Sequence, residues 1–369
     1  MRIALVVPGG VDRSGEYRVI PALLALLARL SAHHDVHVFA LYQEARAATW
    51  NLSGARIHNI GPRFTRVRAV RAIRAMHRPS PFGLMHAIWS GPCSVVAVTA
   101  AHILGIPSLV HIGGGELIAL REIGYGGAQS WHSRLRERLV LRNTAVITAA
   151  SEPTLGMLSR MGLKGVRVPL GVDLVAWPPR EPVRRALDRP ARLIHVASLT
   201  PVKDQATLLQ ALAIAAQSGL SFEMDIVGED VLHGEIQRLA RHLGLIEKIH
   251  FRGFLTQRQL RPLMNAADLM ILSSRHETGP VAVLEAAVAG VPTVGTAVGH
   301  VAEWAPQAAV SVPVGDSTQL AGALCRLLAD EELRLRIARA AFERATREDA
   351  DYTAMRFEAL YSQLVGIKP

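Results

Sequence analysis

Cysteine is almost absent from this chain of 369 residues: only Cys93 and Cys325 occur, far apart in the sequence. Two distant thiols exclude a disulfide framework and a cysteine-based zinc site, and they favour the reducing cytoplasm as the compartment. Aromatic residues make up only 5% of the chain. Because binding of single-stranded nucleic acid relies on bases stacking on interleaved aromatic rings, we expect no nucleic-acid partner.

The sequence also lacks an apolar run long enough to cross a bilayer. The run Ile3–Val7 ends at Pro8-Gly9-Gly10 and is too short for the core of a signal peptide. Residues 79–115 contain no Asp, Glu, Lys or Arg, but Pro92 and Pro107 help to break them into pieces shorter than the roughly 20 residues of a spanning helix. We expect a soluble, cytoplasmic chain without a transmembrane helix.

Positive charge is in excess, but only in one half of the chain. Residues 1–170 hold 20 basic and 8 acidic residues, a net charge of +12, whereas residues 171–369 hold 21 basic and 23 acidic residues, a net charge of −2. A nucleic acid, an anionic membrane surface or an acidic substrate could each account for this asymmetry. The low aromatic content disfavours the first of these.

The densest basic segment, residues 63–78, has helical periodicity. Its apolar residues recur at every third position and arginines occupy much of the remaining surface; the apolar positions are Phe64, Val67, Val70, Ile73 and Met76, and the arginines include Arg66, Arg68, Arg71, Arg74 and Arg78. An amphipathic helix of this kind can lie on anionic lipid, with about 1 kcal/mol from each arginine near the surface. An ordinary helix that covers a sheet and solvates its basic face fits the same pattern, and both interpretations stay open.

Short apolar segments alternate with segments of helical length along the whole chain. The predicted strands span residues 3–7, 36–41, 56–60, 84–89, 108–112, 145–148 and 166–168 in the first half, and 193–197, 223–227, 249–252, 269–273, 293–295 and 310–312 in the second. Continuously apolar strands are typical of parallel sheets covered by helices on both faces. We expect an α/β chain with two doubly wound, Rossmann-like sheets facing a cleft, and a ligand beyond the carboxyl ends of the strands.

The predicted boundary between the two domains is rich in proline, which suits an exposed linker better than a helix. The expected divisions are an N-terminal domain at residues 1–170, a linker at 171–190, a C-terminal domain at 191–349, and a C-terminal helix at about 350–369 that packs back on the first domain.

The segment from Ser273 to Val294, SSRHETGPVAVLEAAVAGVPTV, combines several features of a ligand site. A buried strand is expected to end at Ser273, and the loop after it carries Glu277. A helix then begins near Pro280 and places Glu285 among Leu and Ala side chains, where a carboxylate without a partner would be costly. The N–H groups and dipole of the first helical turn favour an anion. Carboxylates in these positions can accept hydrogen bonds from sugar hydroxyls.

This pattern of two glutamates separated by seven residues, followed by Ala-Gly-Val-Pro, resembles the family-4 retaining glycosyltransferases of the GT-B fold (glycosyltransferase group 1). The resemblance covers nearly the whole chain, and it implies an acceptor domain first and a nucleotide-sugar domain second. The further segments that resemble the family are Pro8-Gly9-Gly10, His111-Ile112-Gly113-Gly114-Gly115-Glu116, Pro169-Leu170-Gly171-Val172-Asp173, Val227-Gly228-Glu229 and Arg252-Gly253-Phe254.

The resemblance implies a role for each matching residue. Glu285 would bind the ribose of a nucleotide-sugar donor, Glu277 would hold the donor sugar, and Lys203 would neutralise the diphosphate. His111 would face the donor sugar near the reacting carbon, so the catalytic residues implied are His111, Glu277 and Lys203. The other residues implied at the donor are Gly9, Gly10, Ser198, Gly228, Gly253, Arg275, Thr278, Gly279 and Val281.

The implied mechanism is transfer with retention, without a covalent nucleophile. Glu277 in a loop and Glu285 about two turns into a helix are not expected to flank one sugar carbon, as the carboxylates of a retaining hydrolase do. The resemblance implies front-face transfer, in which the departing phosphate helps to deprotonate the acceptor hydroxyl. Since Lys203 and a helix dipole can neutralise a diphosphate, we expect no metal and no cofactor besides the donor. The expected acceptor is a glycan, a lipid-linked molecule or a small molecule.

Two departures from the family pattern leave other functions open. Ser198 stands where the family has an arginine, and losing one charge-assisted contact weakens leaving-group stabilisation by about 1.5–3 kcal/mol unless another arginine, such as Arg275, replaces it. Pro280 offers no backbone N–H to the donor sugar. A catalytically weakened scaffold that binds a glycan or a partner, a sugar phosphorylase and a nucleotide-sugar epimerase therefore remain alternatives.

Overall fold

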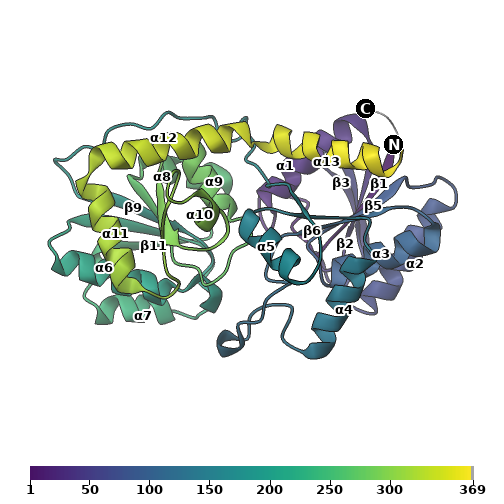
Figure 1. Cartoon of the computed structure of the whole chain (residues 1–369), viewed down its shortest axis with the longest axis horizontal. Coiled ribbons are helices and arrows are strands. Elements are labelled where there is room, and N and C mark those ends of the chain that lie inside the picture. Colours follow the sequence, from purple (N-terminus) through teal and green to yellow (C-terminus); the bar gives the residue numbers. More distant parts are fainter. Residues whose placement is uncertain (367–369) are drawn as a thin grey trace. The chain divides into compact units, whose positions relative to one another are not determined.

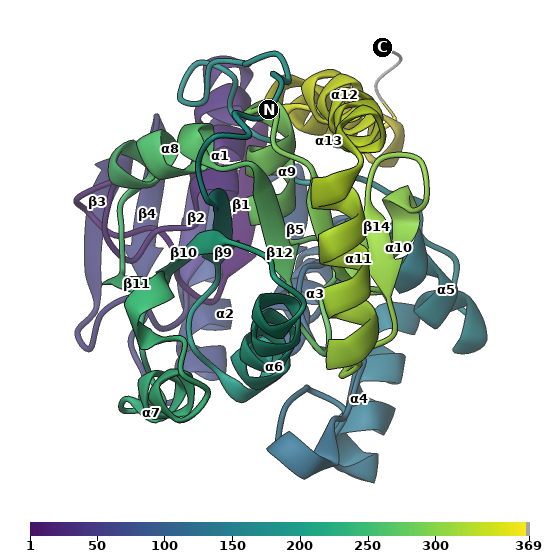
Figure 2. The same cartoon turned by 90° about the vertical axis from the view of Figure 1, so that its left-hand side faces the viewer.

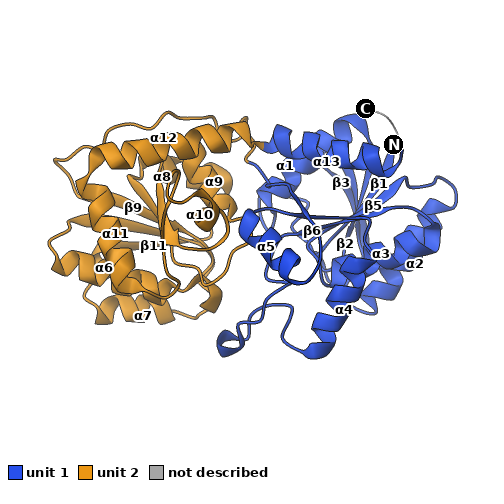
Figure 3. Ribbon diagram, viewed as in Figure 1, with its two compact units in different colours: residues 1–171, 350–369 blue, residues 172–349 orange. Residues whose placement is uncertain are grey.

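The computed structural model describes residues 1–366, which form two compact units (Figures 1 and 3). Unit 1 comprises residues 1–171 together with the C-terminal segment that begins at residue 350, and unit 2 comprises residues 172–349. Each unit has its own sheet and its own apolar core. The prediction of two parallel-sheet α/β domains is confirmed.

Unit 1 is built on an eight-stranded sheet with the strand order β3-β4-β2-β1-β5-β6-β7-β8. Neighbouring strands are parallel except β3 and β4, which form an antiparallel pair. The strands are β1 (Arg2–Val7), β2 (Asp35–Ala40), β3 (Ala48–Leu52), β4 (Ala55–Asn59), β5 (Leu84–Ile88), β6 (Ser108–Ile112), β7 (Val146–Ala149) and β8 (Val166–Arg167). Every residue of β5 and β6 is buried, as expected for strands covered on both faces.

Helices cover both faces of this sheet. In Figure 1, α1 and α13 lie on one side, and α2, α3 and α4 lie on the other. The helices of unit 1 are α1 (Pro21–His33), α2 (Thr65–His77), α3 (Pro92–Leu104), η1 (Arg121–Ile123, a 3-10 helix), α4 (Trp131–Arg142), α5 (Glu152–Arg160) and α13 (Ala350–Leu364). From α13, the buried Tyr361 pairs through its hydroxyl with Nδ1 of His86 in β5 at 2.7 Å. The C-terminal helix thus completes the core of unit 1.

Unit 2 has a six-stranded parallel sheet with the strand order β11-β10-β9-β12-β13-β14. The strands are β9 (Ala191–Val196), β10 (Phe222–Val227), β11 (Ile249–Gly253), β12 (Leu269–Leu272), β13 (Thr293–Thr296) and β14 (Val310–Val312). The helices are η2 (Pro201–Lys203), α6 (Gln205–Gln217), α7 (Glu235–His242), η3 (Ile246–Lys248), α8 (Gln257–Ala266), α9 (Val281–Val288), α10 (Gly299–Trp304), α11 (Ser317–Ala329) and α12 (Glu331–Arg347).

Two core layers sandwich the sheet of unit 2. One contains side chains of α6, α7 and α11, of which α6 and α11 pack side by side (Figure 2), and the other contains side chains of α8, α9, α10 and α12. β12 contributes Leu269 and Ile271 to the first layer and Met270 and Leu272 to the second. Because alternate side chains point to opposite faces, one apolar strand contributes to both core layers. The polar loop then follows at the end of the strand.

Residues 172–190 contain no helix or strand and are mostly exposed from residue 178 onward, but several contacts fix them to unit 2. Val172 and Trp177 are buried in the core layer of α8 and α9, and the backbone N–H of Arg180 donates to the carbonyl of Val288 at 2.9 Å. Proline prevents a helix here but does not prevent an extended segment from packing, and burial of a tryptophan is strongly favourable. This segment is therefore part of unit 2.

The predicted apolar stripe of α2 is only partly in the core, since Val70, Ile73 and Met76 pack there but the other two residues do not. Its buried residues are Thr65, Ala69 and Ile73, spaced by four, whereas Phe64 is 84% and Val67 is 53% exposed. With 3.6 residues per turn, positions spaced by three drift around the helix by about 60° at each step, so five of them cannot share one face. The result is a helix that presents aromatic and aliphatic side chains to solvent between its arginines.

Candidate active site

The loops at the carboxyl ends of β9 and β12 lie side by side in unit 2, because these strands are neighbours in the sheet. Two hydrogen bonds join the loops. The backbone N–H of Arg275 donates to the carbonyl of Val202 at 2.7 Å, and the Ser273 hydroxyl donates to the carbonyl of Lys203 at 2.8 Å. Segments that are about 70 residues apart in sequence thereby form one edge, where parallel sheets bind ligands.

Lys203 and Glu277 form an ion pair at this edge. The ammonium of Lys203 lies 2.6 Å from Oε1 of Glu277, and the Ser274 hydroxyl donates to the same oxygen at 2.7 Å. The side chains of the pair are 26% and 12% exposed, so both remain accessible from solvent. The structure thus brings together the two residues predicted for the diphosphate and for the donor sugar. Sequence reasoning missed Ser274, although it belongs to the serine pair that ends the strand.

Arg275, the predicted substitute for the arginine missing at position 198, is engaged elsewhere. Its Nε lies 3.1 Å from Oδ2 of Asp204, the residue that caps α6. Ser198 is exposed, and its carbonyl accepts from the side-chain amide of Gln205 at 3.2 Å. Since Arg275 serves the start of α6, Lys203 remains the basic residue of this edge that pairs directly with Glu277.

Buried His195 lies below the Lys203 loop as a neutral support. Burial lowers its pKa to about 4, its Nδ1 pairs with the carbonyl of Ile271 at 2.9 Å, and its Nε2 lies 3.2 Å from Nε2 of Gln205. Because the imidazole is neutral, it does not repel the positive charge of Lys203. The contact also links β9, β12 and α6, which helps to fix the loop that carries the lysine.

Glu285 lies in the second turn of α9 and is 5% exposed. One of its oxygens accepts a hydrogen bond from the side-chain amide of Gln257, the first residue of α8. Burial raises the pKa of Glu285 to about 7, and the bond from Gln257 opposes that rise. The sequence indicated that this carboxylate needs a partner, but it did not identify Gln257, because Gln257 belongs to no recognisable motif.

The remaining donor-side residues surround this edge of unit 2. Thr278, Gly279 and Val281 form the loop and first turn at the start of α9, where Pro280 occupies the N-cap position. Gly228 and Gly253 end β10 and β11, and the N–H of Gly228 donates to the carbonyl of Gly253 at 2.9 Å. A Cβ on Gly228 would lie 2.1 Å from the carbonyl oxygen of Ala197, so packing against the Ser198 loop alone requires a glycine there.

In unit 1, the structure places His111 in the core. The side chain is fully buried in β6, its Nδ1 lies 3.0 Å from the Thr148 hydroxyl, and its ring meets Phe357 of α13 edge to face. Burial lowers its pKa to about 3. His111 thus packs in the core of unit 1, and its role at the reacting carbon stays a prediction.

The glycine loop after β1 also has a local explanation. Oε1 of Gln43 accepts from the N–H groups of Gly10 and Val11, at 2.7 and 3.0 Å. Gly10 has φ +81°, and a Cβ on it would lie 2.5 Å from the Ile20 side chain, whereas a Cβ on Gly9 would lie 3.1 Å from Oε1 of Gln43. The N–H of Gly10 is therefore already bonded within unit 1, and its position requires glycine for conformation and packing.

Two carboxyls that were not predicted as a pair, half-buried Glu116 and buried Glu137, gather at the carboxyl ends of β5 and β6. Glu116 accepts from the N–H groups of Ser90 and Gly114, at 2.9 and 2.7 Å, and Glu137 of α4 accepts from the Ser90 hydroxyl. Burial raises the pKa of both carboxyls, and the charge of Glu116 adds to the rise at Glu137. The polar group at this strand end is therefore a carboxyl cluster and not the predicted histidine.

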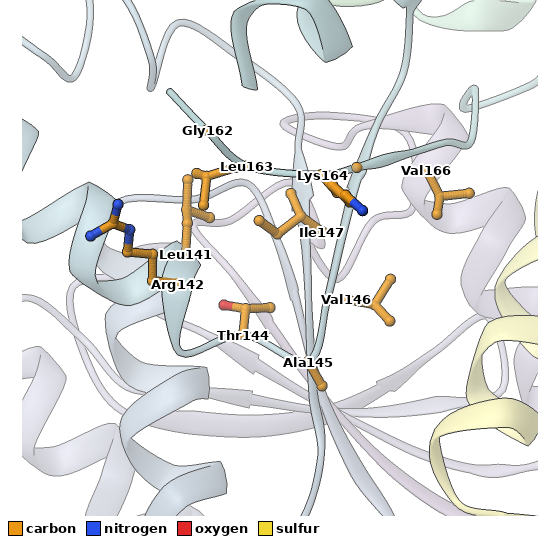
Figure 4. A pocket seen from close by; sticks show the side chains of 11 residues that line it. Leu141, Arg142, Thr144, Ala145, Val146, Ile147, Gly162, Leu163, Lys164 and Val166 are labelled. Carbon is orange, nitrogen blue, oxygen red and sulfur yellow. The ribbon is translucent and has the colours of Figure 1, made fainter. Parts of the chain in front are cut away.

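A cavity of about 350 Å³ opens elsewhere in unit 1, beside the amino end of β7 (Figure 4). Its lining mixes polar groups with apolar side chains such as Leu141, Ile147 and Leu163, and Arg142 and Lys164 lie on different sides of it. Since this is the opposite end of the sheet from the strand ends that carry the polar loops, we do not assign the cavity to the candidate active site.

One Asp-x-Asp triplet occurs in the chain, at Asp349 to Asp351. It lies where α13 begins, and Asp351 forms an ion pair with Arg29 of α1. Within residues 1–366, no three or more His, Cys, Asp or Glu side chains gather as a metal ion would require. No helix in the same range has both the length and the apolar character needed to cross a membrane.

Two family descriptions match the sequence. "Glycosyl transferase 4-like domain" matches residues 18–171, and "Glycosyl transferases group 1" matches residues 180–344. The chain is 29% identical over 245 residues to EpsF of Bacillus subtilis, a protein named as a glycosyltransferase, with 62% of this chain and 61% of that protein covered. It is 31% identical over 173 residues to the N-acetyl-alpha-D-glucosaminyl L-malate synthase of Bacillus anthracis, with 46% and 43% covered. The matched part spans less than two thirds of either relative.

Solved structures share the fold over the whole chain. HepE of Anabaena, in complex with UDP and glucose, matches with a TM-score of 0.76 at 17% identity, covering 99% of this chain and 100% of that one. Sucrose-phosphate synthase of Thermosynechococcus elongatus matches with a TM-score of 0.79 at 18% identity, covering 100% of both chains. At such identities the likeness concerns the fold, which is the GT-B architecture. From the two matched segments and this fold, the chain belongs to the group 1 (family 4) glycosyltransferases.

Proposed function

We propose that this protein is a retaining glycosyltransferase that moves a sugar from a nucleotide-diphosphate sugar to an acceptor hydroxyl. The observation that carries the proposal is the ion pair of Lys203 and Glu277 at the carboxyl ends of β9 and β12, close in sequence to the helix that holds Glu285. Family membership supports the reaction class. The UDP and glucose bound by HepE support a nucleotide-sugar donor.

In this proposal the charges of the site are in place before the donor arrives. Lys203 binds the diphosphate, and Glu277 accepts hydrogen bonds from the hydroxyls of the donor sugar. When the bond between the sugar and the phosphate breaks, negative charge grows on the departing phosphate oxygen, and the ammonium of Lys203 stabilises it. That oxygen takes the proton of the acceptor hydroxyl while the acceptor oxygen bonds to the same face of the sugar carbon. Ser274 and the backbone contacts of the loop keep Glu277 in position.

Thermal unfolding with UDP, GDP, ADP and CDP, each with and without EDTA, tests the donor class and the proposed independence from metal. A ligand at 100 times its dissociation constant adds about 2.7 kcal/mol to the stability of the state that binds it. That gain moves the midpoint by about 5–11 °C for a domain of this size. We expect one nucleotide to give such a shift, equally with EDTA. A shift that EDTA abolishes would overturn the metal-free site, and no shift with any nucleotide would favour a scaffold.

Slow hydrolysis of the selected donor in the absence of acceptor tests the role of Glu277. Glu277→Ala should abolish the hydrolysis, because the variant cannot hold the sugar or the ammonium of Lys203. Glu235→Gln is the matched control, since Glu235 is exposed in the first turn of α7. Equal rates in the Glu277→Ala variant and the wild type would remove Glu277 from the mechanism.

We propose in addition that unit 1 contacts an anionic membrane. The helices α2 and α4 both pack against α3 on one side of the sheet (Figure 1). The apolar side chains exposed on this side belong to Phe64, Val67, Ile103, Trp131, Leu135 and Leu139. α2 and α4 each contain four arginines, and between Glu44 and Glu116 the sequence has no acidic residue. Exposed apolar side chains on helices rich in arginine fit lipid tails beneath anionic head groups.

Sedimentation with vesicles of phosphatidylglycerol and phosphatidylcholine tests this contact. We expect binding that fades with salt and that is lost when Arg66, Arg68, Arg71 and Arg74 are replaced by Gln, since each arginine contributes about 1 kcal/mol. A control with the same net charge replaces four exposed arginines of unit 2 by Gln: Arg326, Arg336, Arg339 and Arg347. Equal loss in both variants would mean that net charge, and not the surface of unit 1, drives the binding. Binding that both variants retain would overturn the proposal.

A further inference from the structure

A chain of two hydrogen bonds leads from the core of unit 2 to Glu285. The indole N–H of Trp177 donates to Oε1 of Gln257 at 2.6 Å, and Nε2 of Gln257 donates to Oε1 of Glu285. Trp177 is 2% exposed and Glu285 is 5% exposed, so solvent competes little with either bond. The three residues come from the segment before β9, from the start of α8 and from α9, and all lie within unit 2.

The chemistry of the three groups allows one arrangement only. An indole can donate but cannot accept, whereas a side-chain amide has an accepting oxygen at one end and a donating nitrogen at the other. Trp177 therefore holds the oxygen of Gln257, and the amide nitrogen is turned toward Glu285. The reverse orientation would set two donors against each other at Trp177 and two oxygens against each other at Glu285. The bond at each end of the amide therefore favours the same orientation of the Gln257 side chain.

We propose that Gln257 is a positioning residue for Glu285, held in place by Trp177, and that it keeps the carboxylate ready to accept hydrogen bonds from hydroxyls of the donor nucleotide. This inference rests on the proposed function, and it adds two residues that no motif contains. Gln257 occupies one oxygen of Glu285, so the carboxylate cannot rotate freely and its second oxygen is left for the ligand. A nucleoside diphosphate with a free vicinal diol is the chemical class that such a carboxylate recognises.

The electrostatics of Glu285 depend on this amide. Burial raises the pKa of Glu285 to about 7, and the bond from Gln257 is the opposing contribution. α8, α12 and β13 pack against α9, and among the described residues none of them contributes a charged group that shifts the pKa of Glu285. Removing or misorienting the amide therefore destabilises the charged carboxylate, and the ionised form, which accepts hydrogen bonds, is lost at neutral pH.

The chain offers a matched control for Trp177. Trp304 lies in the same core layer and is 1% exposed, but within the described part of the chain its indole N–H has no hydrogen-bond partner. Trp177→Phe and Trp304→Phe each remove one buried indole from this layer. Only the first removes a bond that orients Gln257. Gln257→Leu is a third variant, and because Gln257 is half-buried it avoids a large change in the core.

The experiment measures the affinity for UDP, GDP, ADP and CDP at pH 6, 7, 8 and 9 by calorimetry, together with the pKa of Glu285 by carbon NMR of its carboxyl. In the wild type, affinity for the selected nucleotide should rise with pH through about 7. In Trp177→Phe and Gln257→Leu it should fall about tenfold at pH 7 and recover at pH 9, because a bond to a charged group is lost. Trp304→Phe should keep the wild-type profile.

The possible failures are distinguishable. If Trp177→Phe and Trp304→Phe weaken binding equally at every pH, Trp177 is only a packing residue and the inference is wrong. If the pKa of Glu285 is the same in Gln257→Leu and in the wild type, the amide does not hold the carboxylate and the inference is also wrong. If no nucleotide binds the wild type while the pKa of Glu285 still rises in Gln257→Leu, the hydrogen-bond chain exists and the proposed function fails.

Discussion

The two units share one plan but differ in what stands at the ends of their strands. In unit 2, the loops after β9 and β12 bring Lys203 and Glu277 into direct contact. In unit 1, the residue predicted at the corresponding place, His111, is enclosed in the core, and a cluster around Glu116 takes its place. The same reasoning thus selected accessible residues at a strand end in unit 2 and a residue of the core in unit 1.

The two segments differ in how closely the sequence restricts the position of each residue. The segment around Glu277 contains signals for a strand end, a loop, a helix start and a helix end within 22 residues, so the position of each residue relative to these elements can be predicted. His111 lies inside a strand that is buried on both faces. Such a strand has no alternation of apolar and polar residues, so the sequence does not reveal to which face a side chain points. Four predictions test this difference between the two units.

The largest effect should come from Lys203→Ala in unit 2. The substitution removes the ammonium that pairs with Glu277 at 2.6 Å and that is proposed to stabilise the leaving group. Loss of one preorganised electrostatic contact of this kind lowers the catalytic rate by about 10²–10³-fold. Steady-state kinetics with the selected donor measure it, and Lys248→Ala, on the 3-10 helix before β11, serves as the charge-matched control. A rate within a few-fold of the wild type would contradict the role of Lys203.

Alanine at Gly228 should destabilise more than alanine at Gly10, the glycine predicted for a similar purpose in unit 1. A new Cβ at Gly228 would lie 2.1 Å from a backbone oxygen, whereas at Gly10 it would meet the end of the Ile20 side chain at 2.5 Å. Backbone cannot yield as a side chain does, so we expect a loss of about 3 kcal/mol or more at Gly228 and about 1–2 kcal/mol at Gly10. Urea unfolding of both variants measures the order, and a larger loss at Gly10 would reverse the argument.

The pH dependence of stability should reveal the buried carboxyls in both units. Since burial raises the pKa of Glu285 from 4.5 to about 7, folded unit 2 keeps a proton that the unfolded chain has already lost. Its stability therefore falls as pH rises through this window, by up to about 3 kcal/mol. Glu285→Gln should flatten the dependence between pH 5 and 8, and Glu137→Gln should act in the same direction in unit 1, where the pKa is also raised. Urea unfolding at several pH values checks both. A dependence that neither variant alters would mean that these carboxyls are ionised in the folded chain.

The smallest effect on activity should come from His111→Phe. A phenyl ring keeps the edge-to-face contact with Phe357 but leaves the buried Thr148 hydroxyl without Nδ1, so we expect a loss of stability of about 1–3 kcal/mol. We expect the rate per folded molecule to change less than about twofold. Thermal unfolding and steady-state kinetics on the same samples separate stability from activity. A loss of rate without a loss of stability would return His111 to the active site.

The sequence predicts most of the fold, and the exceptions have physical reasons. β3 was missed because its residues are only partly buried or exposed, and it joins β4 through a tight turn in which Ser53 and Gly54 both have positive φ. β3 thus lies outside the apolar core pattern on which the prediction rested.

The candidate site was predictable where neighbours in sequence are also neighbours in space. Glu277, Thr278, Gly279, Val281 and Glu285 come from one segment, and their order alone indicates a site. The bonds from Trp177 to Gln257 and from Gln257 to Glu285 join residues 80 and 28 positions apart. Contacts at that range arise from the packing of α8 and α9, which the sequence pattern does not determine.

The placement of α13 has a consequence for how the protein is made. Unit 1 consists of residues 1–171 and of the segment from residue 350, with all of unit 2 between them in the chain. On the ribosome, unit 2 can emerge and fold while unit 1 still lacks the helix whose Tyr361 and Phe357 cover His86 and His111. The first unit to be started is thus the last to be finished. During synthesis the core surface of unit 1 stays uncovered while the 178 residues of unit 2 are made. Unit 1 is therefore the part of the protein most exposed to chaperones and proteases.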